Sequence, residues 1–222
     1  MEAGTAGTPR FAERGDGVSR DADPTAPTVI QFPKVADPGP LGLAAFALTT
    51  FVLSFFNAGL APASGEPIVF GLAFAYGGLA QILAGMWEFR KSNVFGATVF
   101  TSHGAFWLSF WAYVTFYAPE VPAELHGTAA GWFLISWGIF TAYMFIASLR
   151  TTAAVALVFA LLAVTFIVLG IGNVGGNADV IKAGGYIGIV TAVAAWYASF
   201  AVVVNSTFGR TVMPVVPLGA RA

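Results

Sequence analysis

Titratable side chains inside long apolar stretches give the first functional information in this sequence. His103 lies about 11 residues into a charge-free stretch that runs from residue 92 to residue 119. An imidazole has an unperturbed pKa of about 6.5, so it can change its charge near neutral pH. A titratable group at that depth in a membrane span is a functional candidate by default. The alternative is a neutral histidine hydrogen-bonded to a hydroxyl group of a neighbouring helix.

Uncharged polar side chains are the next candidates, because the long apolar stretches contain no lysine or arginine. A small solute that crossed them would be held weakly, by hydroxyls, amides, helix N-terminal N–H groups and aromatic edges. Weak binding favours passage over capture. The alternative role for each group is a hydrogen bond to a neighbouring helix or a helix cap. The candidates for a substrate pathway are Thr50, Asn57, Gln81, Ser102 and Asn173.

Two carboxylates stand at the ends of apolar stretches and are candidates for an entry or coupling role. Glu88 is followed by Arg90 and Lys91, so a local ion pair at the membrane interface is its simplest role. Asp37 precedes the first apolar stretch, where an aspartate suits the start of a helix.

Several classes of chemistry are excluded by what the 222 residues lack. The chain has no cysteine, no HExxH motif, no glycine-rich phosphate loop followed by lysine, and no paired carboxylates within an apolar stretch. We therefore expect a protein that is not an enzyme and has no catalytic residues, metal site or cofactor. A net charge of −1 indicates no nucleic-acid partner.

The elements that position these side chains follow from the distribution of charge. Only 9% of the residues are charged and 57% are apolar, and ten of the 21 charged residues lie in residues 1–37. Each remaining charge-free stretch is long enough for the roughly 20 residues of a membrane-spanning helix. The sequence therefore predicts an all-α polytopic membrane protein. Its six transmembrane helices fall within residues 38–65, 67–87, 92–119, 125–149, 151–178 and 183–209.

Orientation follows from the basic residues. When the loops are assigned alternately to the two sides of the membrane, nine lysines and arginines fall on one side and Lys182 alone on the other. The positive-inside rule then places both termini in the cytoplasm. We expect a disordered cytoplasmic tail at 1–36, a six-helix domain at 37–210 and a short cytoplasmic tail at 211–222.

Small residues and aromatic residues are unusually frequent within the predicted spans. Glycines at helical spacing let helix backbones approach closely in lipid, although some can instead leave room for a solute. They include Gly71, Gly78, Gly85, Gly131 and Gly138. Deeply placed aromatic residues can narrow a pore, but packing against lipid or another protomer is their commoner role. They include Phe46, Phe106, Trp107, Phe110 and Trp111.

Several motifs occur in the order found in one family. Residues 37–43 (DPGPLGL) match an Asn-Pro-x-Pro-Leu-Gly-Leu signature, with aspartate in place of the asparagine. Further agreement lies at 76–85 (YGGLAQILAG), 93–96 (NVFG), 104–108 (GAFWL) and 208–211 (FGRT). Over about residues 37–214 the chain resembles the acetate uptake transporter family, the succinate–acetate permeases of bacteria and their fungal relatives.

This resemblance implies a protein that carries acetate and related short carboxylates across the plasma membrane, which in bacteria is the inner membrane. It also implies a central pore in each protomer and a homo-oligomer, a hexamer of separate pores. The family's hydrophobic constriction falls on Phe46, Leu162 and His103, where His103 replaces a tyrosine. We expect protonated His103 to favour an anion and transport to rise as pH falls.

Three alternatives remain open at this stage. Fungal relatives are linked to ammonia release, so export of ammonium or ammonia, or a broader monocarboxylate and succinate range, is the first. A membrane sensor that keeps the fold without transport is the second. The third concerns mechanism, because channel-like and proton-coupled transport can use the same weak sites.

Overall fold

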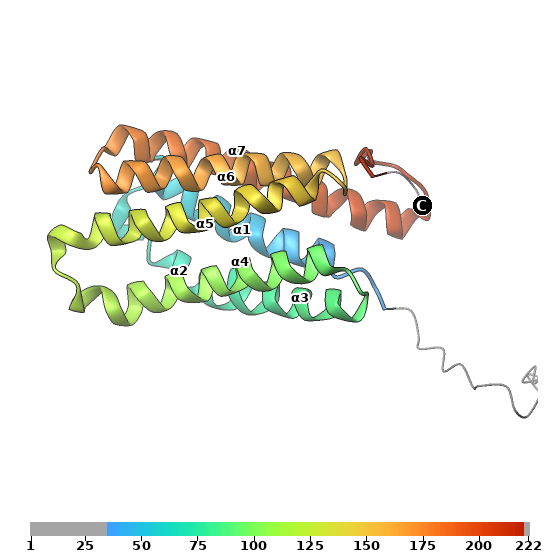
Figure 1. Ribbon diagram of the computed structural model, residues 1–222, viewed down its shortest axis with the longest axis horizontal. Helices are drawn as coiled ribbons and strands as arrows, with labels where there is room; N and C mark the ends of the chain where they lie inside the picture. The colour runs from blue at the N-terminus through green and yellow to red at the C-terminus, as the bar shows by residue number, and fades with distance from the viewer. Residues whose placement is uncertain (1–34, 220–222) are drawn as a thin grey trace, which may run out of the picture. The chain divides into compact units, whose positions relative to one another are not determined.

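The computed structural model describes residues 35–219, and almost all of the expected N-terminal tail lies outside these residues. The described part is α-helical, with one isolated β-bridge and no strand. Figure 1 shows long helices that run side by side. They are α1 (Gly39–Asn57), α2 (Ile68–Phe74), α3 (Gln81–Arg90), α4 (Val94–Ala112), α5 (His126–Ser148), α6 (Ala153–Val174) and α7 (Ala178–Phe208).

Six spans arise from these helices, because α2 and α3 are continuous. A π-helical segment, η2 (Ala75–Ala80), joins them into one helix over Ile68–Arg90. Another, η3 (Tyr113–Tyr117), extends α4. Within residues 35–219, five segments have both the length and the hydropathy of a membrane span. The sixth span is α4, whose 19 residues carry no charge but include hydroxyl groups and His103. The predicted all-α polytopic membrane fold is thus confirmed.

One helix begins earlier than the charge pattern predicts. Helix α7 starts at Ala178, ahead of two charged residues, Asp179 and Lys182. The Asn177 side chain accepts hydrogen bonds from the backbone N–H groups of Asp179 and Val180. An acidic residue in the first turn also interacts favourably with the helix dipole. The charge therefore marks the first turn of α7 and does not precede the helix.

The described part of the C-terminal segment folds back along the start of α6. The N–H of Ala153 donates to the carbonyl of Val216 at 2.8 Å, and the N–H of Leu218 donates to the carbonyl of Thr151 at 2.9 Å. The first of these bonds satisfies an N–H group that the first turn of α6 would otherwise leave unpaired.

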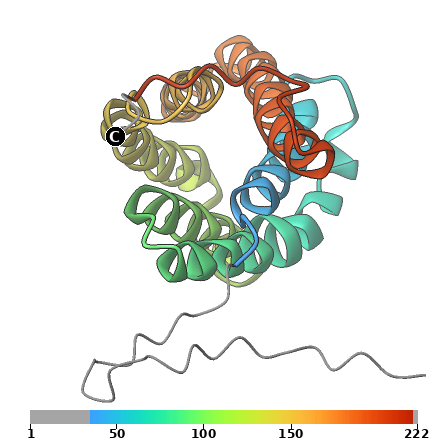
Figure 2. The ribbon, with the colours of Figure 1, turned by 90° about the vertical axis from the view of Figure 1, so that its right-hand side faces the viewer.

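Close packing of the spans depends on small residues. In the end-on view of Figure 2 the helices form a ring, in which α5 packs along α6, α6 along α7 and α7 along α1. A methyl group on Gly131 of α5 would lie 2.7 Å from the carbonyl oxygen of Gly170 on α6, and one on Gly78 would lie 2.5 Å from Cδ2 of Leu108 on α4. Gly71 is different, because nothing lies within 4 Å of the corresponding position.

The deep aromatic residues divide into two groups. Phe46, Phe106 and Trp107 are only 5%, 3% and 3% exposed. Packing against lipid is therefore the wrong role for these three, and they belong to the interior of the protomer. Phe110 and Trp111 are partly buried and pack against the same core.

Candidate functional site

A narrow cavity at mid-depth brings together the three residues of the expected constriction. Phe46 of α1, His103 of α4 and Leu162 of α6 all line it, together with Gln81 of α3. Its volume is about 20 Å³, which is enough for roughly one water molecule but too small for a carboxylate ion. At this level the space between the helices is therefore closed to anything much larger than water unless these side chains move.

Hydrogen bonds to both ring nitrogens orient His103. Nδ1 lies 3.0 Å from the carbonyl oxygen of Val99, which can only accept, so Nδ1 carries the proton in the neutral ring. Nε2 lies 3.4 Å from the Thr141 hydroxyl, which also contacts the carbonyl of Trp137 at 2.8 Å. When the ring is neutral, the Thr141 hydroxyl can donate its one proton either to Nε2 or to the carbonyl of Trp137. In the charged ring Nε2–H donates to the hydroxyl, and every donor has an acceptor.

A second aromatic layer separates the constriction from the end of the bundle that contains Asn57, here called the Asn57 end. Phe106 and Phe166 are in edge contact, with ring centroids 5.1 Å apart. Phe166 stacks on His103 at 6.4 Å, and Phe106 stacks on Phe110 at 6.5 Å. Sequence reasoning assigned Phe166 no role, because its partners lie on α4, far away in the chain.

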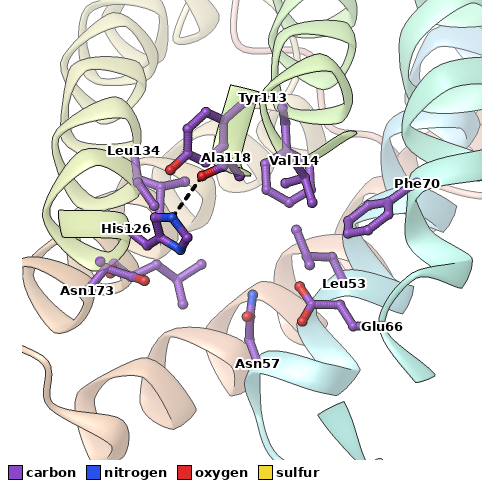
Figure 3. Close-up of a pocket in the computed structure, with 14 residues that line it drawn as sticks. Leu53, Asn57, Glu66, Phe70, Tyr113, Val114, Ala118, His126, Leu134 and Asn173 are labelled. Carbon is purple, nitrogen blue, oxygen red and sulfur yellow. Dashed lines mark hydrogen bonds between the residues drawn. The ribbon is translucent and has the colours of Figure 1, made fainter. Parts of the chain in front are cut away.

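A cavity of about 400 Å³ opens at the Asn57 end (Figure 3). Two expected pathway residues, Asn57 at the end of α1 and Asn173 near the end of α6, line it together. It is also lined by Glu66 and His126, for which the amino-acid pattern carries no functional signal beyond their position in loops. Nε2 of His126 contacts the carbonyl oxygens of Ala118 and Val121 at 2.9 and 2.8 Å, so Nε2 carries a proton.

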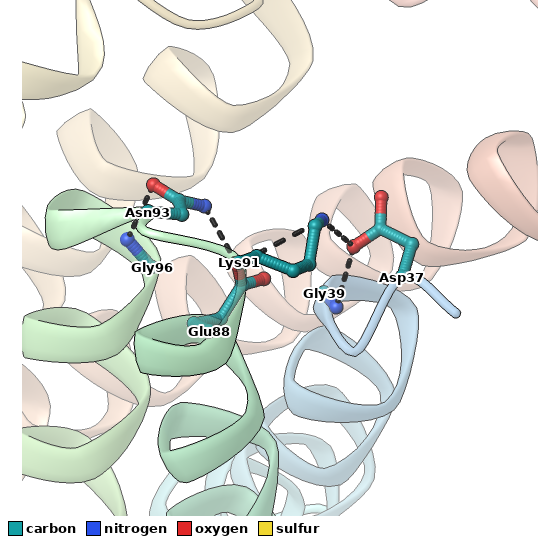
Figure 4. A network of polar contacts seen from close by, with 6 residues as sticks. All are labelled: Asp37, Gly39, Glu88, Lys91, Asn93 and Gly96. Carbon is teal, nitrogen blue, oxygen red and sulfur yellow. Dashed lines mark hydrogen bonds and ion pairs between the residues drawn. The ribbon is translucent and has the colours of Figure 1, made fainter. Parts of the chain in front are cut away.

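The opposite end, here called the Asp37 end, has a cavity of about 250 Å³ lined by Asp37, Glu88 and Lys91. Oδ1 of Asp37 accepts from the N–H of Gly39 at 3.0 Å and from Nζ of Lys91 at 2.9 Å (Figure 4). Glu88 is 2% exposed and lies 3.8 Å from Lys91. Asn93 donates to Glu88 at 2.8 Å. The two candidate coupling carboxylates therefore share one lysine.

The remaining expected pathway residues lie elsewhere. Thr50 and Ser102 line none of these three cavities. Thr50 is buried, and its hydroxyl has no hydrogen-bond partner within residues 35–219. In the same part of the chain, no group of three or more His, Asp or Glu side chains is arranged to hold a metal ion.

Comparison with known proteins places this geometry in a family. Residues 21–220 match the model of the GPR1/FUN34/yaaH family. The chain belongs to this family. It is 43% identical over 197 residues to "Acetate permease A" of Emericella nidulans, which covers 82% of this chain and 66% of that protein. It is 40% identical over 182 residues to the "Succinate-acetate/proton symporter SatP" of Escherichia coli, which covers 82% of this chain and 96% of that protein.

Two further relatives extend the comparison. The chain is 42% identical over 174 residues to "Ammonia transport outward protein 2" of Saccharomyces cerevisiae, covering 76% of this chain and 61% of that protein. It thus spans about two thirds of the lengths of the fungal relatives. The solved structure of the bacterial acetate channel SatP superimposes with a TM-score of 0.77 at 40% identity, covering 82% of this chain and 99% of that one.

Proposed function

We propose that this protein transports acetate and related short carboxylates across the plasma membrane. The observation that carries the proposal is the narrow cavity between Phe46, His103 and Leu162, with a wider cavity toward each end of the helices, in a chain of this family. The bacterial permease, the fungal permease and the acetate channel support acetate as the substrate.

The lining of the cavities fits a substrate that is bound weakly. Within residues 35–219, Lys91 is the one lysine or arginine among the lining residues, and Asp37 already pairs with it. A carboxylate at mid-depth would meet the Gln81 amide and the edges of aromatic rings. Strong binding by a fixed cation would slow release, so this lining favours passage. Thr50 and Ser102, which line none of these cavities, would then affect transport only indirectly, through contacts with neighbouring helices.

The membrane location, orientation and assembly are part of the proposal. The chain is a multi-pass membrane protein, and its relatives support the bacterial inner membrane. The excess of basic residues at the Asp37 end supports cytoplasmic termini. Large apolar side chains such as Trp132, Ile139 and Ile146 are 59%, 62% and 67% exposed on α5. Such a surface requires lipid or neighbouring protomers, which supports a homo-oligomer, proposed to be a hexamer.

Transport is tested with the purified protein in liposomes. We expect saturable uptake of labelled acetate above that of empty liposomes, with succinate measured in parallel. Labelled methylammonium tests the alternative suggested by the yeast relative, and uptake of that cation without acetate uptake would replace the proposal. Uptake of none of the three would leave the membrane-sensor alternative and refute transport.

Orientation has its own test because the natural chain contains no cysteine. Ser64→Cys places a thiol at the Asn57 end and Thr211→Cys places one at the Asp37 end, both at exposed positions. A membrane-impermeant maleimide should label the first in intact cells and the second only after permeabilisation. The reverse pattern would contradict cytoplasmic termini.

A further inference from the structure

Glu66 is an acidic side chain that faces the cavity at the Asn57 end without a partner (Figure 3). Within residues 35–219, no group donates a hydrogen bond to its carboxylate and no cation pairs with it. The side chain is half-buried in the loop before α2. Burial raises the pKa of the Glu66 carboxyl above its ordinary value, so it holds a proton to a higher pH than a solvated glutamate.

Among residues 35–219, no lysine or arginine lines this cavity to offset the effect of burial on the pKa of Glu66. The cavity lining comes from α1, α2, α4, η3, α5, α6 and the turns before α5, and its other titratable side chains are Tyr113 and His126. His126 is anchored to two backbone carbonyls through Nε2. The charged residues of the surrounding loops and of α7 line no part of the cavity: Glu120, Glu124, Asp179 and Lys182.

A carboxylate ligand is the chemical complement of this cavity once Glu66 is protonated. A neutral carboxyl donates one O–H, and an ionised carboxylate accepts it in a short, charge-assisted hydrogen bond. The Asn57 amide, which makes no hydrogen bond to another described residue, lies in the same lining and supplies further N–H donors. Two ionised carboxylates in this half-buried cavity would instead repel each other.

We infer that Glu66 is the proton-binding group of a carboxylate site at the Asn57 end, which takes up one proton with each carboxylate it binds. The proton comes from solution and is shared between the ligand carboxylate and the Glu66 carboxylate, and no other bond forms or breaks. This inference rests on the proposed transport of short carboxylates and assigns the cavity as their docking site at that end.

The affinity of this site for a carboxylate should fall as pH rises. Below the pKa of Glu66 the carboxyl is neutral and the site is ready for an anion. Above it, one proton must be taken up for each anion bound, so affinity falls by about tenfold per pH unit. Fluoroacetate is the suitable probe, because it resembles acetate in size and stays ionised between pH 5 and pH 8. Any change of its affinity in this range therefore reports on the protein.

The experiment measures inhibition of labelled acetate uptake by fluoroacetate in liposomes at each pH. The parent inhibition constant should rise with pH toward the tenfold slope. Glu66→Gln should give a constant that does not vary with pH, because the amide donates an N–H at every pH. Glu66→Asp should keep a pH-dependent constant. Glu120→Gln, which removes a nearby carboxylate outside the cavity, should follow the parent.

The outcomes separate this inference from the proposed function. Absence of acetate uptake by the parent counts against carboxylate transport itself. Uptake by the parent together with the parent slope in Glu66→Gln overturns the role of Glu66 alone. Failure of fluoroacetate to inhibit at any pH, in a parent that carries acetate, overturns the docking site.

Discussion

Replacing Gly85 by alanine tests the close approach of α3 and α4 on which the constriction depends. A methyl group at Gly85 would lie 2.7 Å from the backbone nitrogen of Thr101, against 3.4–4 Å for ordinary contact, and would also meet the Thr101 hydroxyl. Backbone cannot rotate aside as a side chain can, so α3 and α4 must separate. Overpacking of this kind costs about 1–3 kcal/mol.

Gly71→Ala is the matched control for this variant. Both substitutions gain about 1 kcal/mol of helix propensity, but nothing lies within 4 Å of a methyl group at Gly71. The difference in stability between the two variants therefore isolates the cost of packing. We expect Gly85→Ala to unfold at lower temperature than Gly71→Ala in detergent, by an amount equivalent to about 1–3 kcal/mol.

Function should follow the same contact. Gln81 lies one helical turn before Gly85 and faces the constriction beside His103. Separating α3 from α4 moves the Gln81 amide away from the pathway, so acetate flux should fall in Gly85→Ala and persist in Gly71→Ala. Equal stability and equal flux of the two variants would refute the argument that this glycine sets the helix spacing.

Three further predictions concern the pathway. Maximal acetate flux at saturating substrate should rise more steeply in the parent than in His103→Tyr as pH falls from 8 to 5, and identical profiles would refute a role for ring protonation. Leu162→Ala should admit longer monocarboxylates in competition assays while lowering stability by about 2–5 kcal/mol, and an unchanged size range would place the limit elsewhere. Asp37→Asn keeps the acceptor for the N–H of Gly39 but loses the ion pair with Lys91, so the free energy of unfolding should fall by at most about 1 kcal/mol. A larger loss would mean that the pair is more than a surface contact.

The spans were predictable because the cost of placing a charge in lipid acts locally. Each charge-free stretch contains most of one helical span, but the limits differ. Helix α1 ends eight residues before its stretch does, α3 runs three residues past its stretch to Arg90, and α7 begins at Ala178, five residues ahead of its stretch. There Asp179 belongs to the first helical turn, where the helix dipole and the Asn177 cap accept it. A rule that equates a charge with a loop cannot detect this.

The candidate site was only partly predictable. The resemblance supplied Phe46, His103 and Leu162, and the structure brings all three to one cavity. Asn57 and Asn173 also meet, at the Asn57 end. Ser102 shares α4 with His103 yet lines none of the three cavities, and sequence alone gives no reason to distinguish their faces.

What the sequence determined by itself was the class of protein, the number of spans and the distribution of basic residues, since all of these depend on composition along the chain. The tertiary structure decided which side chains face one another. These helices are apolar on most sides, so their rotation about their own axes is set by contacts with neighbours such as Gly85 against Thr101. That rotation, which no single helix encodes, brings Asn57 and Asn173 into one cavity beside the loop residue Glu66 and packs Phe106 against Phe166.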